Sequence, residues 1–380
     1  SITSFRFHGP RTRGTHIKDR NKRDFMDLMH VPGLSGHEDR VHPDPRDRLH
    51  AICAERRSAP IGNLVAHFPG DGPRVMLFTH MDQLGFIVRK IEADGRIRLE
   101  RLGGVPERAL AAQEVLICVG KDMDVSGLIS NKSHHATTAS EKYHVTPYAE
   151  LYVDTGMSCS AEVEAAGIRI GSPVVYAPQA VALNNDRICG TSIDDRAGCA
   201  VLLEVARLLK NRTNGPPVDL AFTVLEEFNL RGALPLAQNL LPDVAIQLDL
   251  MLATDTPDME ARGEMVLGSG PGMSMYSFHG RGTLNGVIPH PAMVNLFERT
   301  ASAENISLQR SAQVGVLTDL SYVQMVGEGV ASIDLGFPMR YSHSARELCD
   351  LNDLVSLAQL LEAALAQIGP NFSLSRDDYT

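Results

Sequence analysis

Residues 74–79 read RVMLFT, and the chain then continues with His80-Met81-Asp82. A nearly unbroken apolar run of this length is typical of a strand that is covered on both faces, as in the middle of a parallel sheet. In open α/β sheets the ligand site lies beyond the carboxyl ends of the strands. The stretch therefore predicts a buried central strand and a functional site that begins at His80.

The chain after Gly190 alternates between helical and strand-like segments. Helical patterns cover residues 196–210, 232–239, 291–304 and 350–368, and strand patterns cover residues 219–225, 243–248 and 330–335. Strands that alternate with helices form largely parallel sheets. We therefore expect an α/β fold with a mostly parallel sheet that is flanked by helices.

Residues 83–175 consist of short alternating segments separated by glycine, with little helical periodicity. This texture predicts a β-barrel-like domain inserted into the α/β domain. The α/β domain, which we expect to be catalytic, would then comprise residues 1–82 and 176–380. Residues 1–23 are rich in Arg, Lys and His and show little periodicity, so we expect an irregular basic lead-in there.

The composition is that of a folded, water-soluble protein. The 380 residues include 36 Lys and Arg against 46 Asp and Glu, and the formal net charge of −10 argues against binding to nucleic acids or anionic membranes.

No apolar stretch approaches the roughly 18 residues that span a bilayer, so we expect a cytoplasmic protein. The six cysteines form no CxxC pair, which indicates reduced thiols rather than a disulfide framework or a thiolate zinc site.

Residue types that bind metals stand near the ends of the predicted strands. The set comprises His80, Glu226 with Glu227, Asp249, His343 after the last strand, and Asp194 before the helix that begins near Arg196. Two imidazoles and several carboxylates at one rim suit two divalent ions such as zinc or cobalt, with one carboxylate bridging them. The sequence therefore predicts a two-metal site.

The adjacent Glu226 and Glu227 are expected to have two different roles, because neighbouring side chains on an extended chain point in opposite directions. One of them can bind metal while the other faces the activated water, which makes Glu226 the candidate proton shuttle. Asp82 lies two residues after His80 and points the same way, so it could orient the His80 ring. Asp195 is expected only to cap the following helix.

Six short motifs follow one another along the chain. They are residues 80–86 (HMDQLGF), 193–198 (IDDRAG), 226–227 (EE) with 231–233 (RGA), 249 (D) with 255–257 (DTP), 318–319 (TD) and 340–344 (RYSHS). This order resembles the TET-type metallo-aminopeptidases, a family that also includes proteins described as glutamyl aminopeptidases and as endoglucanases. The resemblance extends over residues 24–368.

The resemblance implies a zinc-peptidase-like fold and an aminopeptidase that removes N-terminal residues from short peptides. It implies that His80 and Asp249 bind one metal, that Glu227 and His343 bind the other, that Asp194 bridges them, and that Glu226 is the general base. The two ions would be zinc or cobalt, or else manganese. The inserted domain would mediate dimerisation of a homo-oligomer, and the dimers could assemble into a hollow tetrahedral dodecamer.

Other functions are compatible with parts of the pattern. The same set of metal ligands, here called the cage, would serve a metal-dependent deacylase acting on N-acyl amino acids. Only the specificity pocket would distinguish such a deacylase from an aminopeptidase. A glycoside hydrolase is disfavoured because the carboxylates are better accounted for as ligands than as an acid and a nucleophile. A non-catalytic scaffold would need a broken cage. His134 and His135 lie in a Ser/Thr/His-rich segment that we interpret as a solvent-exposed loop.

Overall fold

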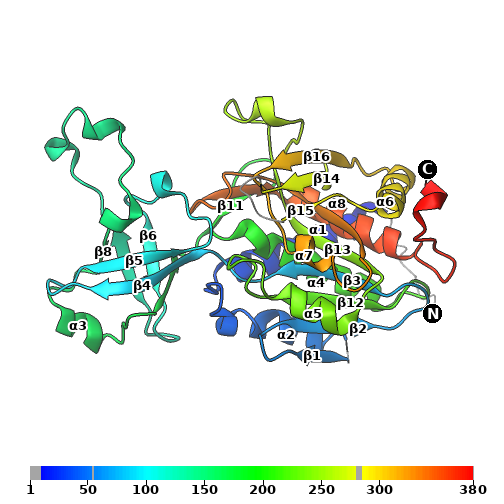
Figure 1. Ribbon diagram of the computed structural model, residues 1–380, viewed down its shortest axis with the longest axis horizontal. Helices are drawn as coiled ribbons and strands as arrows, with labels where there is room; N and C mark the ends of the chain where they lie inside the picture. The colour runs from blue at the N-terminus through cyan, green and yellow to red at the C-terminus, as the bar shows by residue number, and fades with distance from the viewer. Residues whose placement is uncertain (1–9, 54, 280–284, 380) are drawn as a thin grey trace, which may run out of the picture.

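The computed structural model describes residues 10–53, 55–279 and 285–379, which form an α/β body with a smaller barrel beside it (Figure 1). The body contains a twelve-stranded mixed sheet. Its main path runs through β1 (Arg56–Ser58), β2 (Leu64–Phe68), β12 (Val218–Thr223), β3 (Val75–His80), β13 (Val244–Leu252), β17 (Ala331–Arg340), β18 (Glu347–Asp350), β11 (Arg187–Gly190) and β10 (Ala180–Ala182). No helix among the described residues is long and apolar enough to cross a membrane.

The middle of the sheet is parallel, whereas its edges are antiparallel. Strands β12, β3, β13 and β17 pair in parallel, and β2 and β18 join them in the antiparallel sense. A side branch of β14 (Gly272–Phe278), β15 (Gly286–Val287) and β16 (Gln309–Val314) is attached to β17. The α/β fold class is confirmed, and the carboxyl ends of the four central strands meet at one edge, as the site prediction requires.

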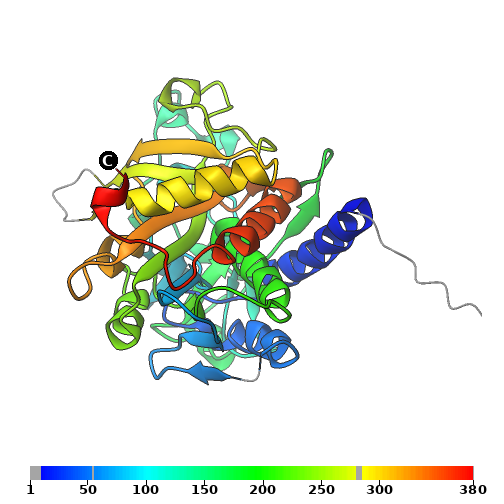
Figure 2. The same cartoon turned by 90° about the vertical axis from the view of Figure 1, so that its right-hand side faces the viewer.

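Helices cover both faces of the sheet, as Figures 1 and 2 show. One face carries α1 (Pro10–Met29), α2 (Pro43–His50), α4 (Ile193–Leu209), α6 (Pro291–Ala303) and α8 (Leu351–Leu365), and the other carries α5 (Ala233–Leu240) and α7 (Leu320–Val323). On β3, Val75 and Leu77 pack into the first core, while Met76 and Phe78 pack into the second. Because successive strand residues point to opposite faces, the apolar run that begins at Val75 serves both cores.

The prediction of an irregular lead-in is wrong for residues 10–23, which belong to helix α1. Residues 1–9 lie outside the described part of the chain. Ile17 and Phe25 are buried on the side of α1 that faces α4 and α8, and Arg20 pairs with the buried Glu204 of α4. The weak apolar periodicity hid the helix, because its stability comes from tertiary packing rather than from a pronounced apolar stripe.

The second part of the molecule is a closed six-stranded barrel. It is made of β4 (Gly85–Ile91), β5 (Ile97–Leu102), β8 (Val153–Asp154), β7 (Val125–Ile129), β6 (Glu114–Ile117) and β9 (Pro173–Tyr176), with α3 (Ser160–Ala165) outside it. The barrel has its own apolar core, in which the rings of Phe86 and Tyr176 meet edge to face. His134 and His135 lie exposed in the long connection between β7 and β8, and neither belongs to a potential metal-binding group among the described residues.

Candidate metal centre

The candidate ligands arrive from separate elements at the carboxyl edge of the sheet. His80 is the last residue of β3, Glu226 and Glu227 follow β12, Asp249 lies near the end of β13, Asp194 lies at the start of α4, and His343 follows β17. Asp194, Glu226, Glu227, Asp249 and His343 line one cleft of about 440 Å³. His80 lies behind them and is only 1% exposed.

Asp194 lies between the two imidazoles. Its Oδ1 atom is 3.0 Å from Nε2 of His80, and its Oδ2 atom is 3.2 Å from Nε2 of His343. Burial alone would raise the pKa of Asp194, but the two histidines outweigh burial and lower it. Each oxygen of one carboxylate thus faces a different imidazole, which is the geometry expected of a bridging ligand.

Each of the two imidazole rings is oriented by a contact of its Nδ1 atom with a backbone oxygen. Nδ1 of His80 lies 3.1 Å from the backbone oxygen of Asp82, and Nδ1 of His343 lies 2.9 Å from the backbone oxygen of Gly104, which follows barrel strand β5. Each Nδ1–H can donate to its carbonyl, so Nε2 is the ring atom that faces Asp194, and it would give up its proton to bind a cation. The barrel therefore contributes directly to the site through Gly104.

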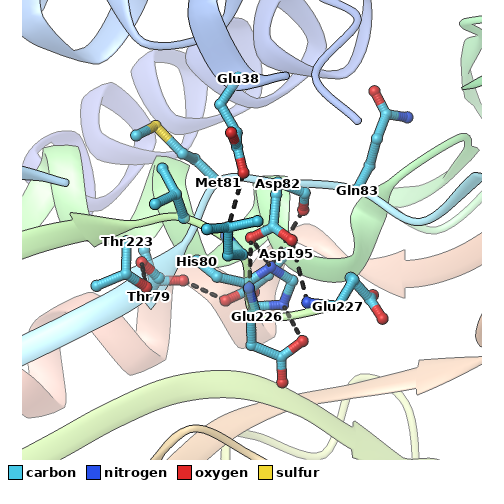
Figure 3. A network of polar contacts seen from close by, with 12 residues as sticks. Glu38, Thr79, His80, Met81, Asp82, Gln83, Asp195, Thr223, Glu226 and Glu227 are labelled. Carbon is cyan, nitrogen blue, oxygen red and sulfur yellow. Dashed lines mark hydrogen bonds and ion pairs between the residues drawn. The ribbon is translucent and has the colours of Figure 1, made fainter. Parts of the chain in front are cut away.

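Asp82 connects the end of β3 to the loop that carries the two glutamates. Its Oδ1 accepts the backbone N–H of Glu226 at 3.1 Å, and its Oδ2 accepts that of Glu227 at 3.0 Å (Figure 3). The side chain is completely buried. Because both oxygens are engaged by amides, Asp82 is suited to position the loop and the His80 ring rather than to contact a substrate.

The two glutamates approach different histidines. Oε2 of Glu226 lies 3.7 Å from Nε2 of His80, and Oε1 of Glu227 lies 3.8 Å from Nε2 of His343. Burial raises the pKa of Glu227 to about 7. Burial, together with the charges of Glu227, Asp249 and Asp319, holds the pKa of Glu226 well above its usual value.

The cluster has the chemistry of a cation site. Two groups of potential ligands have all their donor atoms within 4.8 Å of one another, namely His80 with Asp195 and Asp249, and His80 with Asp194 and Glu227. Oε1 of Glu227 is buried without a hydrogen-bond partner. Burial and neighbouring carboxylates also raise the pKa of Asp249 well above its usual value. Divalent cations would relieve this repulsion, and the mixed carboxylate and imidazole donors fit zinc-like ions.

Asp195 is the alternative to Asp194 as a metal ligand, but both of its carboxylate oxygens already accept hydrogen bonds. Oδ1 of Asp195 accepts the backbone N–H of Gly198 at 3.2 Å, and Oδ2 accepts the hydroxyl of Thr79. The helix-capping prediction agrees with the first contact. We therefore regard Asp194, whose two oxygens face imidazoles, as the better bridging candidate.

Glu347 is a positioning residue that sequence reasoning missed. Its Oε2 accepts the backbone N–H of Asp194 at 3.0 Å, and its Oε1 accepts that of His343 at 2.8 Å. His343 has a positive φ of 66°, so the second bond stabilises a sparsely populated turn. The glutamate is buried at the start of β18, only four residues after His343, but no side-chain pattern in the sequence indicates that it binds backbone amides.

Two further buried acids lie around the site. Oε1 of Glu38 accepts the backbone N–H groups of Gly36 and Leu225, which supports the loop that precedes Glu226. Asp319 is 1% exposed, and neither of its oxygens has a hydrogen-bond partner. Burial raises the pKa of Asp319 to about 8. The motif at residues 318–319 had marked Asp319, whereas nothing in the sequence marked Glu38.

The M42 glutamyl aminopeptidase family matches residues 62–360. The chain is 35% identical to the putative aminopeptidase SgcX of Escherichia coli over 362 residues, which cover 93% of this chain and 95% of SgcX. The TET aminopeptidase of a marine sediment Thaumarchaeota archaeon has a TM-score of 0.87 at 27% identity, with 95% of this chain and 100% of that chain covered. The Pyrococcus horikoshii TET1 peptidase, which can assemble into a tetrahedron or a large octahedral shell, has a TM-score of 0.81 at 25% identity over 91% of this chain and 99% of that chain.

The chain therefore belongs to the M42 glutamyl aminopeptidase family. It is an aminopeptidase, a hydrolase of a metallopeptidase family, which implies divalent metal ions, and the clustered His and Asp side chains offer a possible site for them. The resemblance predicted from the sequence motifs is confirmed.

Proposed function

We propose that the protein is a two-metal aminopeptidase in which His80 and Asp249 hold one divalent ion, Glu227 and His343 hold the other, and Asp194 bridges them. The observation that carries the proposal is the position of Asp194, whose two oxygens lie 3.0 and 3.2 Å from the Nε2 atoms of the two histidines. Zinc or cobalt suits this donor set best, and manganese is the third candidate.

Divalent ions in this cage would supply Lewis acidity, which polarises a carbonyl and lowers the pKa of water. Glu226 supplies the proton transfers. Its carboxylate lies at the cleft, and it takes the proton of the water that attacks the scissile carbonyl of the peptide. It then returns a proton to the departing amine, so that one residue serves as base and acid in sequence. Asp82 keeps Glu226 in place by accepting its backbone N–H.

The acidic wall of the cleft accounts for cleavage at the first residue. Asp194, Glu226, Glu227 and Asp249 all line it, and a free α-amino group is the part of a peptide that such a wall attracts. An N-acylated substrate lacks that positive charge. The deacylase alternative therefore receives no support from the cleft, and it is not favoured by relatives that are named aminopeptidases.

Short peptides are the proposed substrates, and a homo-oligomer is the proposed assembly. The assembly is supported by the Pyrococcus horikoshii TET1 peptidase, which forms closed shells, and the inserted barrel is the proposed dimerisation domain. Light scattering coupled to size exclusion measures the mass directly. A mass equal to that of one chain, 41.3 kDa, would contradict this part of the proposal.

The test of the function uses apo protein that is reloaded separately with zinc, cobalt or manganese. Bound metal is counted by plasma mass spectrometry, and hydrolysis is measured on aminoacyl p-nitroanilides and on N-acyl amino acids. We expect two ions per chain and metal-dependent cleavage of the free-amine substrates only. A single ion per chain, or cleavage restricted to N-acylated compounds, would refute the proposal.

A further inference from the structure

The cleft has a second wall that takes no part in the proposed metal cage. Its aliphatic residues are Leu230, Leu250, Leu252, Val316 and Leu317. Among the described residues that line the cleft, the carboxylates are confined to the acidic wall, and none of the lining residues is Lys or Arg. Five aliphatic side chains therefore lie beside the cage, and the polar lining residues outside the acidic wall are Asn229, His279, Thr318, Ser342 and the cage ligand His343.

This apolar wall begins directly beside the cage. Leu250 follows the candidate ligand Asp249 on β13, Leu252 lies two residues further along, and all three residues line the cleft. Leu230 comes from the loop that carries Glu226. A side chain attached one bond away from the scissile carbonyl is therefore within reach of this wall when the carbonyl lies at the cage.

The segment that supplies Val316 and Leu317 is held against the sheet. It follows β16, and the backbone N–H of Gly315 donates to the oxygen of Phe278 at 2.7 Å. Val316 also borders a small cavity of about 20 Å³ behind the cleft, which it shares with Leu250 and Leu252. The three segments thus place their aliphatic side chains on one cleft, which we call the apolar pocket.

We propose that this pocket selects peptides whose N-terminal residue is uncharged and aliphatic, such as leucine, a specificity that rests on the aminopeptidase function proposed above. A glutamate side chain would lose its hydration beside four carboxylates without any Lys or Arg among the described lining residues to pair with it. A lysine side chain would find carboxylates only in the acidic wall, where three are proposed metal ligands and the fourth, Glu226, is the proposed general base. An aliphatic side chain gains from burial and leaves no charge unpaired.

His279 is the one titratable residue among the described lining residues apart from the proposed ligands and Glu226. Its Nδ1 atom is buried without a hydrogen-bond partner. A single imidazole offers a glutamate side chain fewer N–H donors than a guanidinium or an ammonium group does. A glutamate preference created by His279 would be lost in a His279→Gln variant.

The experiment compares kcat/KM of the metal-loaded enzyme on leucyl, alanyl, glutamyl and lysyl p-nitroanilides. The expected value for the leucyl substrate is about tenfold to hundredfold above that for the alanyl substrate, which is the discrimination that a few methylene groups provide. The glutamyl and lysyl substrates should lie below both. A glutamyl or lysyl optimum would overturn the proposed specificity and leave the aminopeptidase function intact, whereas cleavage of none of the four would overturn both.

A charge introduced into the apolar wall tests its location. Leu252→Arg should raise the ratio of glutamyl to leucyl kcat/KM by about tenfold or more, because an arginine can pair with the glutamate side chain. Leu241→Arg places the same charge on an exposed position outside the cleft and should leave the ratio unchanged. Val316→Arg repeats the test from the half-buried loop if the strand variant fails to fold. Unchanged ratios in the folded wall variants would refute the pocket assignment.

Discussion

Nε2 of His80 lies 3.0 Å from Oδ1 of Asp194, although 114 positions separate the two residues in the chain. The contact joins the carboxyl end of the central strand β3 to the start of helix α4. Because the other oxygen of Asp194 faces His343, this one carboxylate connects the two halves of the proposed cage.

Replacing Glu226 by glutamine should reduce kcat by about a thousandfold, because loss of a positioned general base typically costs between a hundredfold and ten-thousandfold. The metal content should stay at the wild-type value, since Glu226 is not among the proposed ligands. Stopped assays on the leucyl substrate and metal analysis of the same sample provide the two readings. Near-normal turnover would remove Glu226 from its proposed role.

Asp194→Asn and Asp195→Asn form a matched pair that separates the bridging candidate from its neighbour. We expect Asp194→Asn to weaken binding of at least one ion by more than a hundredfold. Asp195→Asn should have about a tenfold effect, because Asp195 acts through Thr79 and Gly198. Isothermal titration of the apo proteins with zinc measures both. The assignment of the bridge would have to be reversed if the larger loss were found at Asp195.

Glu347→Gln should weaken metal binding by about tenfold to hundredfold, the usual effect of losing a group that supports metal ligands. A glutamine can accept only one of the two amides of Asp194 and His343, and its own N–H groups oppose the other amide. Titration with zinc gives the affinity. The exposed Glu328 is a suitable control for loss of one carboxylate, and equal affinities in the two variants would contradict the positioning role.

Asp334 should make the folded state less stable as the pH rises. Burial raises the pKa of Asp334 to about 7, although the hydrogen bond that Thr318 donates to it lowers the pKa. The folded state then binds the proton more tightly than the unfolded state does, so the stabilisation is complete below about pH 4 and is lost as the pH rises through about 7.

Asp334→Asn keeps an acceptor for the Thr318 hydroxyl and removes this titration. Between about pH 5 and pH 8, the free energy of unfolding of the wild type should therefore fall by about 3 kcal/mol more than that of the variant, from two pH units at 1.36 kcal/mol each. Urea denaturation of both proteins at the two pH values measures the difference. Parallel pH dependences would show that Asp334 does not titrate in this range.

Several parts of the site could be predicted because they follow from local chain order. His80 ends an apolar run, and Asp249 lies near the end of another buried strand, so the parallel sheet brings both residues to the same edge. Glu347 and Gly104 could not be found in this way. Glu347 acts by accepting amides of Asp194 and His343, and Gly104 acts through its carbonyl, and side-chain periodicity carries no information on such backbone contacts.

Helix α1 shows the same limit at the level of the fold. Its charged residues gave no apolar stripe, and Asn21 is buried along with Ile17 and Phe25. The ion pair between Arg20 and Glu204 of α4 adds a contact that depends on a residue far along the chain. A helix stabilised in this way is visible only after its neighbours are in place.

The sequence by itself determined the α/β class and the inserted barrel, and it predicted the candidate donor set, because hydrophobic periodicity and strand-end positions are local properties. Only the tertiary structure decided how the adjacent Asp194 and Asp195 are held in the orientations that suit a bridging ligand and a helix cap. Their orientation depends on the Thr79 hydroxyl, which lies 116 positions before Asp195, and on the carboxylate of Glu347. The apolar wall beside the cage was likewise decided by the fold, since Leu230, Leu252 and Val316 meet only when three separate segments pack together.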